Sequence, residues 1–323
     1  MKQKAARNRT LTLSDEDKTN YSNKLLTLSG RAKIEDVLNK TVNQDLLKAA
    51  SFLPAGFVDL LIADPPYNLY KAFGKTTFKK KNFDEYENYT RNWLEKIFHT
   101  LKPDASVYVC SDWETSLVIY KVLREFFTVR NRITWEREKG RGAKSNWKNC
   151  SEDLWFCTRA DDYFFDSEAV KLKRKVVAPY KENGKPKDWN AEEDGNFRLT
   201  SASNFWTDIS IPFWSMPENT EHPTQKPEKL IAKLILASSR QNDVVFDPFL
   251  GSGTTSVVAK KLGRRYLGVE LSDKYACLAE KRLEIAERDN SIQGYSGGFF
   301  WERNTLPMQK KAATRQHRLI IKT

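Results

Sequence analysis

Short apolar runs alternate along the chain with stretches in which apolar residues recur every three or four positions. The short runs predict buried strands at 58–63, 106–110, 129–135, 154–158, 244–246 and 266–270. The periodic stretches predict amphipathic helices at 89–101, 114–126, 227–237, 256–262 and 274–288. Because strands and helices alternate, we predict an α/β protein with a mainly parallel, doubly wound, Rossmann-like sheet and helices on both faces.

The same pattern divides the chain into five parts. It fails at 165–221, where proline and glycine interrupt the apolar periodicity, so we predict an insert with little regular structure. The other parts are a basic arm with short helices at 1–40, two halves of the main domain at 41–164 and 222–290, and a tail at 291–323.

Charge and cysteine content narrow the class of protein. The 323 residues include 54 Lys and Arg against 42 Asp and Glu, a net charge of +12. A positive surface agrees with a nucleic-acid partner, because it supplies the sequence-independent part of phosphate binding. The four cysteines lack the spacing of a zinc site or a disulfide framework, and no apolar run reaches the roughly 20 residues of a membrane span. We therefore expect a cytoplasmic protein without a metal site or a membrane segment.

The segment Asp64-Pro65-Pro66-Tyr67 follows the predicted strand at 58–63, where α/β enzymes keep their chemistry. Consecutive prolines lack two backbone donors and leave their carbonyl oxygens as acceptors. With the Asp64 carboxylate and the aromatic face of Tyr67, these oxygens suit an exocyclic amine on a heterocycle. Accepting both N–H hydrogens would free the lone pair of that nitrogen for attack. The alternative is a diproline turn that only closes a core strand.

A second motif, Asp247-Pro248-Phe249-Leu250-Gly251-Ser252-Gly253-Thr254-Thr255, follows the predicted strand at 244–246. A predicted helix and a second strand that ends at Glu270 come next, which is the order of a nucleotide-binding βαβ unit. Glycines let the backbone approach a ligand, and an acid at the tip of the next strand can hold a ribose diol. The motif lacks the third glycine of the dinucleotide fingerprint.

Two basic segments with interleaved aromatic residues are candidate nucleic-acid contacts. One follows Tyr67 directly, and the other lies at 130–148. Such segments suit a phosphate backbone beside unstacked bases, although exposed lysine-rich loops have the same composition. The candidate contacts are Lys71, Lys75, Lys79, Lys80, Arg137, Arg141 and Lys144.

These motifs resemble those of the S-adenosylmethionine-dependent amino-methyltransferases of DNA. A third segment, His222-Pro223-Thr224-Gln225-Lys226-Pro227, resembles the block that this family carries just before its glycine motif. The order of the blocks is that of the circularly permuted β class, many of whose members belong to bacterial restriction-modification systems. The resemblance implies S-adenosyl-L-methionine as the cofactor and double-stranded DNA as the substrate.

The resemblance also assigns roles to single residues. Asp64 and the Pro65 carbonyl would accept hydrogen bonds from the target amine, Pro66 would belong to the same rigid turn, and Tyr67 would stack on the base.

A second set of residues is implied to bind the cofactor. It consists of Asp45, Asp64, Thr224, Lys226, Asp247, Phe249, Gly251, Gly253, Thr254 and Glu270. Glu270 would hold the ribose, and Thr224 with Lys226 would hold the methionine carboxylate. Asp45 would reach the adenine of the cofactor, although an Asp at this position also suits a helix N-cap.

In this family Asp is usual at the first position of the tetrapeptide for adenine, and Ser is common for cytosine. We therefore predict a site-specific N6-adenine DNA methyltransferase of a bacterial or archaeal cell, which extrudes its target base from the duplex. The insert at 165–221 would read the sequence. The alternatives are transfer to cytosine N4, transfer to RNA, and a catalytically silent DNA-binding relative. Related enzymes are often homodimers and often accompany a separate endonuclease; these residues by themselves indicate neither.

Overall fold

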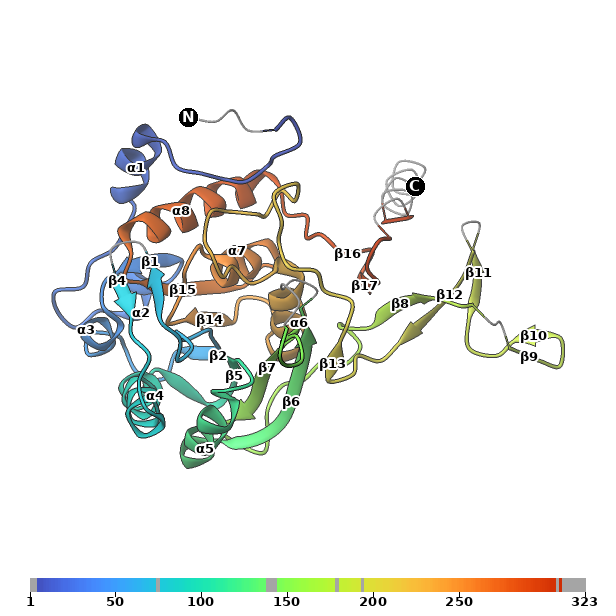
Figure 1. The fold of residues 1–323 in the computed structure, drawn as a ribbon, viewed down its shortest axis with the longest axis horizontal. Helices are drawn as coiled ribbons and strands as arrows, with labels where there is room; N and C mark the ends of the chain where they lie inside the picture. Colours follow the sequence, from blue (N-terminus) through green and yellow to red (C-terminus); the bar gives the residue numbers. More distant parts are fainter. Residues whose placement is uncertain are drawn as a thin grey trace.

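The computed structural model describes residues 5–73, 76–137, 144–177, 180–192, 195–305 and 308–309. At its centre is an eight-stranded sheet in the order β1-β15-β14-β2-β5-β7-β6-β13 (Figure 1). These strands are β1 (Lys40–Asn43), β15 (Arg265–Glu270), β14 (Val244–Asp247), β2 (Val58–Ala63), β5 (Leu101–Ser111), β7 (Ser151–Thr158), β6 (Thr128–Glu136) and β13 (Phe205–Trp206). Neighbours run parallel except at β7, which is antiparallel to β5 and β6. The predicted α/β fold is confirmed.

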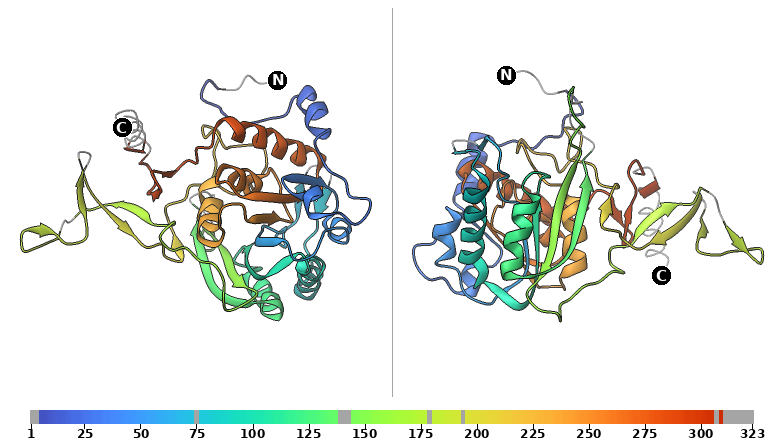
Figure 2. Two further views of the ribbon diagram at one scale, coloured as in Figure 1. Left: turned by 180° about the vertical axis from the view of Figure 1, so that it is seen from behind. Right: turned by 60° about the horizontal axis from the view of Figure 1, so that its bottom comes forward.

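Helices cover both faces because successive side chains of a strand point to opposite sides. Leu61 and Ala63 of β2 pack in the layer that holds α3, α4 and α5, whereas Leu60 and Ile62 pack in the layer of α6, α7 and α8. Figure 2 shows the two groups of helices on opposite sides of the sheet. The helices are α1 (Asp15–Ser22), α2 (Ile34–Val37), α3 (Leu46–Ala50), α4 (Phe83–Phe98), α5 (Ser116–Phe126), α6 (Glu228–Ser238), α7 (Thr254–Lys261) and α8 (Asp273–Arg288).

Helix α4 begins at Phe83, six positions before the predicted start at residue 89. Its N-cap is Asn82, which accepts a hydrogen bond from the Glu85 amide while the Glu85 side chain accepts one from the Asn82 amide. This reciprocal capping box is visible in the sequence as Asn-x-x-Glu and fixes the start of a helix better than apolar periodicity does.

The insert is more regular than predicted, and the expectation of little regular structure was wrong. It contains β8 (Leu172–Lys175), β9 (Lys181–Glu182), β10 (Lys185–Pro186), β11 (Asn190–Glu192) and β12 (Gly195–Thr200). Strands β8 to β12 form an arm that projects from the body of the molecule (Figure 1). The turn between β9 and β10 is Asn183-Gly184, with φ of +52° and +77°. Asn-Gly favours two-residue hairpins, so the signal was present in the sequence.

The C-terminal part of the chain completes the second sheet. Strands β16 (Tyr295–Ser296) and β17 (Phe299–Trp301) extend it to the order β11-β12-β8-β17-β16. Strand β17 runs parallel to β8, with Phe300 opposite Leu172. The base of the arm is therefore built from segments far apart in the chain, a pairing that local periodicity cannot reveal.

The N-terminal arm is attached to the body at several points. The amide of Arg9 donates to the Trp214 carbonyl, and that of Leu11 donates to the Asn219 carbonyl. Asp17 in α1 pairs with Lys281 of α8 at 2.7 Å. Within the described part of the chain, no helix combines the length and the apolar character that crossing a membrane requires.

Candidate active site

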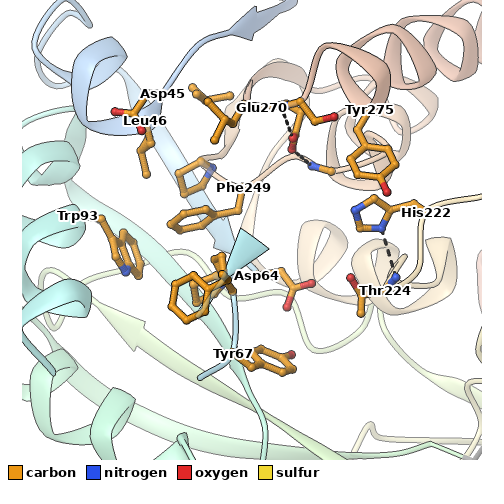
Figure 3. Close-up of a pocket in the computed structure, with 18 of the residues that line it drawn as sticks. Asp45, Leu46, Asp64, Tyr67, Trp93, His222, Thr224, Phe249, Glu270 and Tyr275 are labelled. Atoms are coloured by element: carbon orange, nitrogen blue, oxygen red, sulfur yellow. Dashed lines mark hydrogen bonds between the residues drawn. The ribbon is translucent and has the colours of Figure 1, made fainter. Parts of the chain in front are cut away.

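A cavity of about 290 Å³ opens at the edge where the carboxyl ends of the parallel strands meet. Figure 3 shows Asp64 and Tyr67 at one end and Asp45 and Glu270 at the other. The sequence-predicted residues that line it are Asp45, Asp64, Pro65, Pro66, Tyr67, Thr224, Lys226, Phe249, Gly251 and Glu270. The fold therefore joins the tetrapeptide after β2, the segment before α6 and the loop after β14 in one site.

Asp64 directly follows β2 and holds one carboxylate oxygen toward a cation. Its Oδ2 accepts from Lys226 Nζ at 2.6 Å. Its Oδ1 is buried and finds no hydrogen-bond partner among the described residues. An unpaired buried acceptor costs free energy, so this oxygen is suited to a donor on a ligand.

Lys226 is buried, with 8 % of its side chain exposed, and its ammonium faces three oxygens. These are Asp64 Oδ2 at 2.6 Å, the Tyr67 hydroxyl at 3.2 Å and Glu152 Oε2 at 3.2 Å. Burial by itself would lower the pKa of Lys226, but the Asp64 and Glu152 carboxylates outweigh it and raise the pKa above its usual value. An ammonium has three N–H donors, and these three contacts use them. The family resemblance had instead implied that Lys226 contacts the methionine carboxylate of the cofactor.

Hydrogen bonds fix both Tyr67 and Pro66. The Tyr67 hydroxyl donates to Glu152 Oε2 at 3.0 Å, and the Tyr86 hydroxyl donates to the Pro66 carbonyl at 3.1 Å. Burial raises the pKa of Tyr67 well above its usual value, and the charges of Asp64 and Glu152 raise it further, so the phenol stays protonated. Its ring lines the cavity with a fixed orientation.

Glu152 is a site residue that the sequence reasoning missed. It lies at the start of β7, which is antiparallel, so its first residues reach the edge where β2 ends. It is 5 % exposed, and its Oε1 pairs with Arg137 Nη1 at 2.7 Å. Glu152 shares a strand face with Leu154 and Phe156, which are core residues. The sequence did contain a signal for this site: a charged residue at a strand position whose alternate neighbours are apolar.

Asp247, Gly253 and Thr254 lie beneath the glycine loop and hold its shape. Asp247 accepts from the Phe249 amide at 2.9 Å and from the Thr255 hydroxyl at 2.6 Å. Gly253 has φ of +84° and packs against α8. The Thr254 hydroxyl accepts from Arg282 at 2.9 Å. The three residues thus support the loop, while Phe249 and Gly251 face the cavity.

Glu270, at the end of β15, has both oxygens on backbone amides. Oε2 accepts from the Gly251 amide and Oε1 from the Ser272 amide, each at 2.7 Å (Figure 3). Burial raises the pKa of Glu270 to about 7, against the lowering effect of these bonds. The carboxylate keeps further lone pairs, so it can still accept from a diol.

Two other predicted cofactor residues lie at opposite ends of the cavity. Asp45 caps α3 by accepting from the Lys48 amide at 3.2 Å, and it lines the cavity as well, so the two roles considered for this residue are compatible. The Thr224 amide donates to His222 Nδ1 at 3.4 Å, and the His222 ring lies edge-on to Tyr275 with centroids 4.4 Å apart.

The candidate DNA contacts are placed only in part. Lys79 and Lys144 are exposed. Lys80 pairs with Glu114 at 2.7 Å, and Arg137 pairs with Glu152. The Lys71 side chain and all of Lys75 and Arg141 lie outside the described part of the chain.

Comparisons with known proteins identify the family of the chain. Residues 58–281 match the model of a DNA methylase family, N6_N4_Mtase. The chain is 32 % identical over 256 residues to DNA adenine methyltransferase YhdJ of Escherichia coli K12, covering 76 % of this chain and 82 % of that protein. It is 31 % identical over 248 residues to type II methyltransferase M.HpaI of Haemophilus parainfluenzae, covering 76 % and 74 %.

Solved structures share the fold at lower identity. The PvuII cytosine-N4-specific DNA methyltransferase aligns with a TM-score of 0.53 at 17 % identity, covering 82 % of this chain and 94 % of that one. TTHA0409 of Thermus thermophilus, in complex with S-adenosyl-L-methionine, aligns with a TM-score of 0.53 at 19 % identity, covering 82 % and 98 %. Motifs, fold and relatives agree, and the chain therefore belongs to the N6/N4 family of S-adenosylmethionine-dependent DNA methyltransferases.

Proposed function

We propose that the protein transfers a methyl group from S-adenosyl-L-methionine to the N6 amine of an adenine extruded from double-stranded DNA. The observation that carries the proposal is Asp64, which lines the cavity and whose Oδ1 is a buried acceptor without a partner in the described structure. An amine N–H is a donor that this oxygen lacks.

The residues around Asp64 supply the rest of the chemistry. Pro65 lines the same cavity and offers its carbonyl as a second acceptor, and Tyr67 offers a flat face of fixed orientation on which the extruded base can stack. Accepting both amine hydrogens makes the nitrogen lone pair available. Lys226 fixes the orientation of the Asp64 carboxylate through the 2.6 Å contact with Oδ2. Asp64 thus orients the amine, and the proton leaves after the methyl has moved.

The far end of the cavity fits the cofactor, which supplies a methyl group on a positively charged sulfur when it is bound. We assign the ribose hydroxyls to Glu270, the adenine to the Asp45 end, and the methionine part to Phe249, Gly251 and Thr224. The volume of about 290 Å³ lies near the lower end of ligand pockets, roughly 300 Å³. Alignment of nitrogen, methyl and sulfur is the main demand on this arrangement.

The choice of adenine rests on relatives as well as on Asp64. A relative that is 32 % identical carries the name DNA adenine methyltransferase, and a type II methyltransferase is 31 % identical. We extend both points to this chain: the base is adenine, and the biological setting is a restriction-modification system in the bacterial cytoplasm.

The test is transfer of labelled methyl from S-adenosylmethionine to unmethylated genomic DNA, followed by nucleoside digestion and mass analysis. We expect N6-methyladenine, and a loss of roughly 100-fold or more in Asp64→Asn, which keeps the size of the side chain and removes its charge. Cofactor binding measured by calorimetry shows whether the variant is folded. N4-methylcytosine would reassign the base, and methylated RNA without methylated DNA would overturn the proposal.

A further inference from the structure

Glu152 connects three side chains around the reacting end of the cavity. Its Oε2 accepts from the Tyr67 hydroxyl at 3.0 Å and lies 3.2 Å from Lys226 Nζ. Its Oε1 pairs with Arg137 at 2.7 Å. Both carboxylate oxygens therefore contact protein groups, and the residue is only 5 % exposed to solvent.

The charged side chains of this cluster differ in how deeply they are buried. Asp64 and Glu152 carry two negative charges around the single buried ammonium of Lys226. Arg137, 38 % exposed at its side chain, brings the balancing charge from the rim of the site. The reaction moves positive charge from the sulfonium sulfur to the amine nitrogen, so an inner excess of negative charge favours the transition state.

Geometry gives Glu152 a second effect. The Tyr67 ring is anchored at its hydroxyl by Glu152, while Lys226 Nζ lies 5.3 Å from the centroid of the same ring. A carboxylate at this place fixes the angle of the ring and shares the ammonium with Asp64. Asp64 then needs only Oδ2 for Lys226, and Oδ1 stays available.

We propose that Glu152 is a positioning residue of the methyl transfer, which orients Tyr67 for stacking and shares Lys226 with Asp64 so that Asp64 Oδ1 receives the target amine. The proposal rests on the function proposed above. This role differs from that of a residue that only anchors the end of the sheet. Replacing such an anchor would impair folding and leave the rate of the folded enzyme unchanged.

Glu152→Gln keeps the shape and removes the charge. The matched control is Asp153→Asn, the same change one residue on and on the opposite strand face, where Asp153 accepts from Ser116 and Thr134 at 2.8 Å each. Tyr67→Phe removes the hydroxyl that Glu152 holds and keeps the aromatic face.

The measurement is the single-turnover rate of methyl transfer to unmethylated genomic DNA by the full chain, together with the Kd for S-adenosylmethionine. We expect Glu152→Gln to slow transfer by about 10- to 100-fold, with a Kd within about threefold of the wild type. Asp153→Asn should transfer at the wild-type rate per folded molecule. The double variant Glu152→Gln, Tyr67→Phe should lose less than the product of the two single losses, because both single variants remove the hydrogen bond between Glu152 and Tyr67.

Two results would overturn the proposal while leaving the proposed function intact. One is an active wild type with an unchanged rate in Glu152→Gln, and the other is a double variant whose losses simply multiply. A wild type that methylates no DNA would overturn both proposals at once. The first pair of results and the last are therefore distinguishable in the same experiment.

Discussion

Gly253 turns the glycine loop into α7 with φ of +84°, against the backbone of α8. A Cβ at this position would lie 2.5 Å from Ala279 Cβ and 2.8 Å from Ala279 Cα. We expect Gly253→Ala to lower the free energy of unfolding by about 3 kcal/mol or more, from steric overlap and a left-handed backbone together. Chemical denaturation measures the change.

The matched control is Gly56→Ala. Gly56 has φ of +63°, but nothing lies within 4 Å of its Cβ position, so only the backbone cost of about 1 kcal/mol applies. Adding Ala279→Gly to Gly253→Ala should restore the steric part. Equal losses in the two alanine variants would show that the contact with α8 is unimportant.

We expect Glu270 to make cofactor binding depend on pH. Its pKa is raised to about 7 by burial, and the ionised form is the one that accepts from ribose hydroxyls. Binding should therefore release a proton, and affinity should rise with pH through about 7 and level off above it. We expect S-adenosylmethionine to bind about tenfold more weakly at pH 6 than at pH 8, measured by calorimetry.

Asp247 is the nearby acid that could produce the same pH dependence, because burial also raises its pKa to about 7. Glu270→Gln should flatten the pH dependence of the Kd, whereas Asp247→Asn should retain it. The reverse pattern would assign the titration to Asp247, which supports the glycine loop, instead of Glu270.

At the level of elements, α6 is tied to the insert and to β17 by buried lysines. Asp208, which follows β13, pairs with Lys229 at 2.6 Å and with Lys233 at 2.8 Å. Lys229 also donates to the Trp301 carbonyl of β17. Burial lowers the pKa of Lys229 to about 8, despite the attraction of Asp208.

Removing the Asp208 carboxylate, which the two lysines share, should therefore strongly destabilise the fold. We expect Asp208→Ala to lower the free energy of unfolding by about 3–5 kcal/mol, because two ammonium groups are then buried without a counter-charge. Adding Lys229→Met and Lys233→Met should recover most of the loss, as measured by urea denaturation. A small effect of Asp208→Ala alone would contradict a closely packed junction.

Elements differ in how far the sequence predicted them. The strands at 58–63 and 266–270 were placed within a residue because they are apolar runs with clear ends. The bounds of α4 were missed because caps, and not periodicity, set where a helix starts. The arm was missed because strands such as β9, β10 and β11 are short and exposed throughout, so they show no sustained alternation of apolar and polar residues.

For the whole molecule, we propose that the arm reads the DNA sequence while the body binds the cofactor and transfers the methyl. Exposed lysines near the tip of the arm, Lys181, Lys185 and Lys187, offer contacts to phosphates. Lys175 and Phe197 are paired across β8 and β12, so we expect an Asn-Gly turn in place of residues 176–196 to preserve the pairing of these two strands.

We expect this shortened protein to bind S-adenosylmethionine as the full chain does and to lose site-specific methylation of DNA. Calorimetry and sequencing of methylated positions measure the two properties. Unchanged methylation at the same sites would place recognition elsewhere. Loss of cofactor binding would show that the arm also supports the body.

The sequence by itself predicted the class of fold and the two chemical motifs, because a strand end, a rigid diproline segment and a glycine turn are local properties. The resemblance of these motifs to a known family implied the cofactor. Tertiary structure decided what these residues contact. It placed Lys226 on Asp64, brought Glu152 to the site from an antiparallel strand, and put Asp247 and Gly253 beneath the loop. Burial and ion pairing depend on segments far apart in the chain, and only the assembled sheet brings those segments together.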